Sequence, residues 1–374
     1  MNEPETRDAE TVEEAPARLA LPPPPARVVA PPAGVLDRVL VAIETRPWVA
    51  ALAIFAFLLV LHLGVLNLAG VASGIFVGEA LFFATGSGAV EIVLLAFIAY
   101  NVVLPTLFAQ ACIGTYDALR PALQVEEHQI ASTRARLLDP FYGIRLGAGL
   151  LWAVLLTPVF GTLLRETVPG EGAGAAILTL WLYIRIALTF GLLGASIGFI
   201  VMLHHRFRGA TGSELRIDLF DLAPLRPIAA YARTVALYLV ILLALAGPAV
   251  AQPDAVYASS AILLLGVLLT AVAVAGAMWG ARRAIRAAKR TALAELQAYS
   301  RELWRRAYAN NKVAEAVAIP ALGAMLTVRN EIARIPDWPG GWGVFARLAT
   351  LAAIPVASWF GGQFVAQLTT AFAP

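Results

Sequence analysis

The sequence predicts an all-α integral membrane protein with about seven transmembrane helices, its N-terminus inside and its C-terminus outside. Three observations predict this fold. The 374 residues are 59% apolar or aromatic and 14% charged, whereas soluble domains are about 45–50% apolar and 25% charged. Seven apolar stretches are long enough to cross a bilayer. Nearly all basic residues fall on one side of the resulting topology.

The first 34 residues are expected to form a disordered, acidic and proline-rich cytoplasmic tail. Acidic side chains dominate positions 1–14, and Pro22 to Pro25 follow among alanine and valine. Such a stretch buries too little apolar surface to offset the entropy of ordering it. Because it opens acidic rather than basic and no apolar core follows, it is not expected to be a signal peptide.

The spans follow from length, because a bilayer core of about 30 Å needs roughly 20 helical residues. The candidates are 48–70, 89–112, 146–164, 174–203, 231–251, 256–280 and 345–371. The first six form a transmembrane region over residues 35–280, and the last occupies 345–374. Pro355 and the Gly361–Gly362 pair predict that this last helix is kinked or broken.

The basic residues support this count. With the N-terminus inside, 26 of the 28 lysines and arginines fall in inner segments, and shifting the count by one span destroys this sorting. Only Arg165 lies in an outer turn, and Arg185 lies within a span. The abundance of arginine, alanine, glycine and proline favours a bacterial source. The expected location is therefore the bacterial cytoplasmic membrane.

Three polar segments are expected in the cytoplasm: 113–145, 204–230 and the helical extension 281–344. The sixth span continues without a helix breaker, so its helix should project well beyond the bilayer. Residues 313–328 are apolar but too short to cross, which predicts a helix in a cytoplasmic bundle or at the interface. Five basic residues follow the span and either face anionic lipid or only fix the topology; they are Arg282, Arg283, Arg286, Lys289 and Arg290.

Charged residues inside spans are costly and usually mark function. Glu91 and Arg185 both lie in the outer halves of their spans, so an ion pair between them is possible. Such a pair either fixes helix packing or leaves Arg185 lining a polar cavity that selects by charge. Asn101 lies close to three turns from Glu91 and shares its face, whereas Gln110 aligns only loosely.

Other polar and small residues in the spans complete the candidates. Gln363 and Gln367 share one helix face and either line a water path or bond a neighbouring helix. His62 is expected to be a packed histidine, and the His204–His205 pair to belong to the basic flank of the fourth span. The GxxxG pattern of Gly194 and Gly198 is expected to serve packing within one chain.

No enzyme motif is found, so the protein is not expected to be an enzyme. A phosphate-binding loop, an HExxH helix and a nucleophile elbow with a plausible triad are all missing. The single cysteine, Cys112, excludes a thiolate zinc site within one chain. Neither a metal nor a cofactor is expected. The topology alone is similar to that of the insect odorant and gustatory receptor channels, and this resemblance implies a channel without identifying site residues.

Three functions are therefore compared. The first is an ion channel or channel-like conduit formed by a homo-oligomer, with Glu91, Asn101, Arg185, Gln363 and Gln367 as lining candidates. The second is a non-conducting scaffold or signalling protein that binds cytoplasmic proteins through the tail or the 282–335 helix. The third is a small-solute transporter. The lipid bilayer is the expected surrounding in each case, and nucleic acid is not an expected partner.

Overall fold

Long helices make up nearly all of the described chain in the computed structural model. The described residues are 43–70, 76–77, 80–81, 86–137, 142–165, 172–250, 256–309 and 313–339, with four single positions up to residue 353. Within these residues, six helices are long and apolar enough to cross a membrane, which indicates a multi-pass membrane protein. The tail 1–34 and the span 345–371, apart from three single positions, lie outside the described residues. The count of seven and the orientation stay predictions.

The described elements follow the expected spans closely. In chain order they are α2 (Pro47–Leu68), β1 (Phe76–Val77), β2 (Ala80–Leu81), α3 (Gly86–Ala118), α4 (Glu127–Leu137), α5 (Tyr142–Arg165), α6 (Ala173–Ser213), α7 (Arg226–Val250), α8 (Val256–Ala309) and α9 (Val313–Arg334). Pro47 begins α2 where a missing backbone N–H costs least. Gly70 follows its end with a φ of 70°, the left-handed conformation common after a helix.

Two features differ from the expected pattern. The polar segment 113–145 contains α4, an amphiphilic helix with Glu127 in its first turn and Arg134 and Arg136 in its last. These charges oppose the helix dipole favourably at both ends. The outer connection after α2 contains β1 and β2, which pair antiparallel over two residues each. The two-residue strands are too short to leave a hydrophobic period in the sequence.

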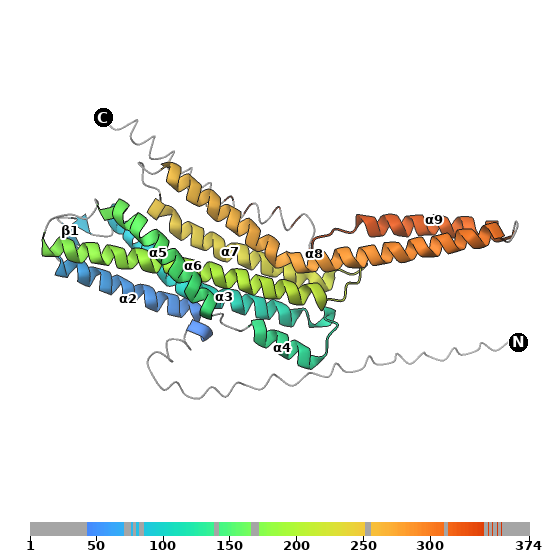
Figure 1. Cartoon of the computed structure of the whole chain (residues 1–374), viewed down its shortest axis with the longest axis horizontal. Helices are drawn as coiled ribbons and strands as arrows, with labels where there is room; N and C mark the ends of the chain where they lie inside the picture. The colour runs from blue at the N-terminus through green and yellow to red at the C-terminus, as the bar shows by residue number, and fades with distance from the viewer. Residues whose placement is uncertain are drawn as a thin grey trace, which may run out of the picture. The chain divides into compact units, whose positions relative to one another are not determined.

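α3 is the most buried of the six candidate spans, and α5 is the least. α3 packs against α2, α6 and α7, and α8 completes the core against α6 and α7 (Figure 1). Leu104, Phe108 and Cys112 of α3 are fully buried there. α5 packs along α6 and leaves the large apolar side chains on its other side exposed, as expected for a helix that faces lipid.

Glycines allow α5 and α6 to approach closely. A Cβ built on Gly149 would lie 2.8 Å from the carbonyl oxygen of Gly191, and one on Gly194 would lie 2.7 Å from the Trp152 ring. A Cβ built on Gly198 would lie 3.0 Å from the Cβ of Ala148. The small-residue face of α6 is therefore used within one chain, and that expectation is confirmed.

α8 is 54 residues long, so it continues well past the length of one span. α9 returns alongside its second half and makes a helical hairpin (Figure 1). The expected continuation of the sixth span and the helix predicted over 313–328 are both present.

Candidate functional site

Glu91 and Arg185 form an ion pair that joins α3 to α6. The Glu91 side chain is 29% exposed and that of Arg185 only 7%. A charge buried to this degree is costly unless a partner compensates it. The pair therefore fixes the register of the two helices, and the geometry considered possible from the sequence is present.

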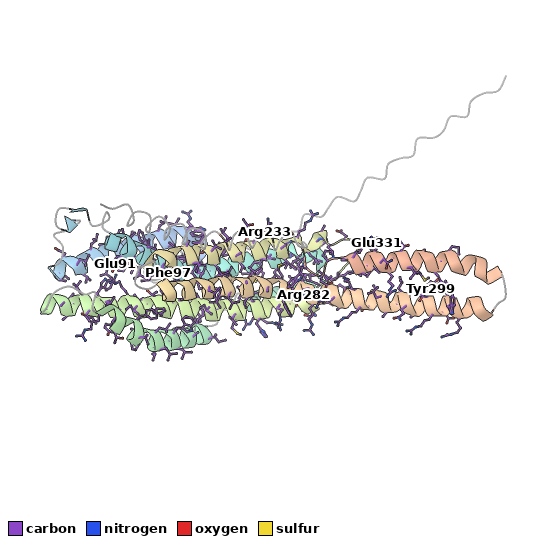
Figure 2. All side chains as sticks on the ribbon, turned by 90° about the horizontal axis from the view of Figure 1, so that it is seen from above. Glu91, Phe97, Arg233, Arg282, Tyr299 and Glu331 are labelled. Carbon is purple, nitrogen blue, oxygen red and sulfur yellow. The ribbon has the colours of Figure 1, made fainter. Side chains whose placement is uncertain are left out.

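Two aromatic side chains extend this pair to a third helix. The Arg185 guanidinium lies 5.9 Å from the ring centroid of Trp181, one turn earlier in α6, within cation–π range. Trp181 Nε1 donates a hydrogen bond of 2.9 Å to Nδ1 of His62 in α2. Because Nδ1 accepts, the neutral imidazole holds its proton on Nε2. We call Glu91, Arg185, Trp181 and His62 the charge cluster. In Figure 2, Glu91 of this cluster lies far along the molecule from Arg282 of α8.

Asn101 is buried farther along α3. Ser196 Oγ of α6 donates to the Asn101 backbone oxygen over 3.2 Å, and Asn101 Nδ2 donates to the Phe97 carbonyl over 2.9 Å. Asn101 Oδ1 has no hydrogen-bond partner among the described residues. Gln110 is exposed, and its side chain donates to the Glu44 carbonyl. The polar face of α3 therefore includes Asn101 but not Gln110.

His204 lies inside the core and not on the basic flank where the sequence placed it. Its ring is 6.2 Å from that of Phe108 in α3 and 5.8 Å from that of Tyr231 in α7, and its Nδ1 faces Gly276 of α8. α6 continues to Ser213, which brings His204 into the bundle. Nε2 of His204 has no hydrogen-bond partner within the described part of the chain.

Glu214 joins three helices at the far end of α6. Tyr116 of α3 donates a hydrogen bond of 2.6 Å to Glu214 Oε2, and Thr133 of α4 donates one of 3.2 Å to Oε1. The Glu214 backbone oxygen also accepts from the N–H of Gln124 over 2.8 Å. This junction holds α4 against the ends of α3 and α6.

The basic residues after the sixth span are used in part within the chain. Lys289 Nζ donates to the carbonyls of Ala333 and Ile335, at the end of α9, and to Asp337 Oδ1. Arg286 Nε donates to Asp337 Oδ2 over 2.8 Å. The Arg286 hydrogen bond, followed by that of Lys289, holds the Asp337 pKa below its ordinary value of 3.8, since both favour the carboxylate.

Arg282 also contacts the segment after α9, beside Asp337. Its guanidinium lies 4.3 Å from the ring centroid of Trp338 and 5.2 Å from that of Trp279. Arg283 and Arg290 are exposed. Three of the five basic residues thus join α8 to the segment after α9, and two remain exposed.

The remaining candidates lie elsewhere. Gln363 and Gln367 lie outside the described residues. Within the described ranges, no three histidine, cysteine or acidic side chains gather as metal ligands would. Comparison of the chain with known protein families, curated proteins and solved structures finds no match.

Proposed function

We propose that the chain is a subunit of an ion-conducting membrane protein, a channel or channel-like conduit. The observation that carries this proposal is the Glu91–Arg185 ion pair between two membrane helices. Ionisable groups at such positions are rare and are typical of ion pathways and proton relays. Fixed charges beside a path also set its selectivity.

Ion flux through the purified full chain in liposomes tests the proposal, with separate potassium, sodium, proton and chloride gradients. Arg185→Gln leaves the Glu91 carboxylate uncompensated and should raise cation relative to anion permeability. Glu91→Gln should shift the ratio the other way. Arg165→Gln removes an exposed arginine at the end of α5 and should match wild type. A wild-type protein that conducts none of these ions contradicts the proposal.

The scaffold function is favoured by one different observation. Tyr299 and Trp304 of α8 are 62% and 52% exposed on the hairpin, where aromatic side chains commonly anchor protein contacts. Under this alternative the wild type conducts nothing, and the Tyr299→Ser, Trp304→Ser double variant loses a cross-linked complex present in native membranes. A small-solute transporter would instead show saturable uptake.

The homo-oligomer and the bacterial cytoplasmic membrane stay predictions. The exposed apolar side chains of α5 suit lipid as well as a second copy of the chain. The mass of the purified particle, corrected for bound detergent, shows whether α5 faces lipid in a single chain or a second copy in an oligomer. We further propose a non-enzymatic role for the chain.

A further inference from the structure

α3 and α6 run parallel and meet at four levels. The number of each α6 residue exceeds that of its α3 partner by 94 to 98, so the register is nearly constant. The four contacts are Glu91–Arg185, Asn101–Ser196, Phe108–His204 and Tyr116–Glu214. We call this line of contacts the α3–α6 seam.

The seam is as long as a membrane is thick. From Glu91 to Tyr116 the helix advances roughly 25 residues, or about 37 Å at 1.5 Å per residue. The hydrocarbon core of a bilayer is about 30 Å thick. Each level contributes a carboxylate, amide, hydroxyl or imidazole from at least one helix. Polar groups therefore recur along the inside of the bundle over the whole distance that an ion must cross.

Buried atoms along the seam have unused hydrogen-bonding capacity. Within the described residues, no partner reaches Asn101 Oδ1, His204 Nε2 or Arg185 Nε. Buried polar atoms in proteins are nearly always hydrogen-bonded, and those that lack a protein partner usually bind water. These three atoms lie at three successive levels, so water molecules between them would extend the polar line.

The layers between the levels restrict what passes. Leu95 and Ile98 lie between the first two levels, and Leu104 lies between the second and third; all three are buried almost completely. A hydrated metal ion would have to displace these side chains. A proton needs only a transient chain of water and groups that exchange protons, as in the Asp, Glu and His relays of membrane pumps.

His204 is suited to the central position of such a chain. Imidazole can accept a proton at one nitrogen while releasing one from the other. It is surrounded by Phe108 of α3, Tyr231 of α7 and Gly276 of α8, and the Tyr231 hydroxyl lies beside the Cys112 thiol. Glu91 with Arg185 and Glu214 with Tyr116 provide titratable groups at the two ends.

We infer that the α3–α6 seam is a proton path inside each chain, with His204 as its central relay. This inference rests on the proposed function and names the proton as the ion carried. The path uses contacts within one chain and does not need an interface between copies.

Proton uptake into liposomes that contain the full chain and a trapped pH-sensitive dye tests the inference. A potassium gradient with valinomycin drives the protons. His204→Phe keeps an aromatic ring in the core but removes the relay, and its flux should fall by about tenfold or more. Asn101→Leu removes the amide at nearly constant volume and should also reduce flux. His205→Phe changes an exposed neighbour and should behave as wild type.

The outcomes separate this inference from the proposed function. If the wild type conducts potassium or sodium but no protons, the proton path is wrong and ion conduction stands. If it conducts nothing, both are wrong. The proton path is also wrong if Asn101→Leu and a folded His204→Phe each show the same proton flux as the wild type. Asn101→Leu alone decides the question if His204→Phe does not fold.

Discussion

The α3–α6 seam and the α8–α9 hairpin each hold two long helices together, but by different contacts. The seam buries the arginine of its ion pair, since Arg185 is only 7% exposed while Glu91 is 29% exposed. The hairpin is joined at its base by Arg286, Lys289 and Asp337, whose contacts remain partly open to water. Removing either partner of a buried ion pair lowers the stability of the fold strongly, whereas a solvated ion pair contributes little to stability. The bundle should therefore depend strongly on single residues, and the hairpin weakly.

The largest effect is expected from Arg185→Leu. This change leaves the Glu91 carboxylate beside α6 without its counter-charge and should lower the free energy of unfolding by about 3–5 kcal/mol. Thermal unfolding of the purified protein in detergent measures it. The Glu91→Leu, Arg185→Leu double variant should be more stable than Arg185→Leu, since no charge is left unpaired. Equal loss in both variants would show that the pair is not what holds this level of the seam.

A smaller effect is expected from Gly149→Ala. The added methyl group would lie 2.8 Å from the Gly191 carbonyl oxygen, so α5 and α6 must separate at a cost of about 1–3 kcal/mol. Gly147→Ala, two residues earlier on α5, meets nothing within 4 Å and is the matched control. Thermal unfolding of the two variants compares them directly. If both are as stable as wild type, the close approach of the two helices is not required.

The smallest effect concerns the base of the hairpin and depends on pH. Because the pKa of Asp337 is below 3.8 in the folded protein, its contact contributes fully above pH 3.8 and is lost as pH falls through the lowered pKa. The contribution should stay below about 1 kcal/mol, since the contacts are partly open to water. Spin labels at the exposed positions 287 and 333 should report a broader distance distribution in acid. Asp337→Asn should show the broad distribution at every pH.

Periodicity and charge sorting in the sequence predict the helices well because a membrane imposes strong rules on both. The predicted Glu91–Arg185 contact came from the depth of two charges along their helices, and the α8 extension from the lack of a helix breaker. Gln110 and Asn101 show the limit of this reasoning. Both are polar residues of one span, and only packing against α6 decides that Asn101 is buried and Gln110 exposed.

Other parts of the site carry no signal that one sequence reveals. His204 follows directly after a predicted span and precedes arginines, so it resembles a flanking base. Only the structure shows that α6 continues to Ser213 and so carries His204 into the core. The Trp181–His62 hydrogen bond joins residues far apart in the chain, and neither residue type demands that partner. Likewise, the basic residues of α8 gave no indication that Lys289 binds the end of α9.

That lysine has a consequence for the length of the hairpin. Lys289 on the outgoing arm contacts Ala333, Ile335 and Asp337 on the returning arm. These contacts fix one position of α8 against the end of α9. Insertions or deletions therefore leave the base undisturbed only when both arms change by the same number of residues. The hairpin can lengthen or shorten at its tip in paired helical turns, while the joint next to the membrane stays constant.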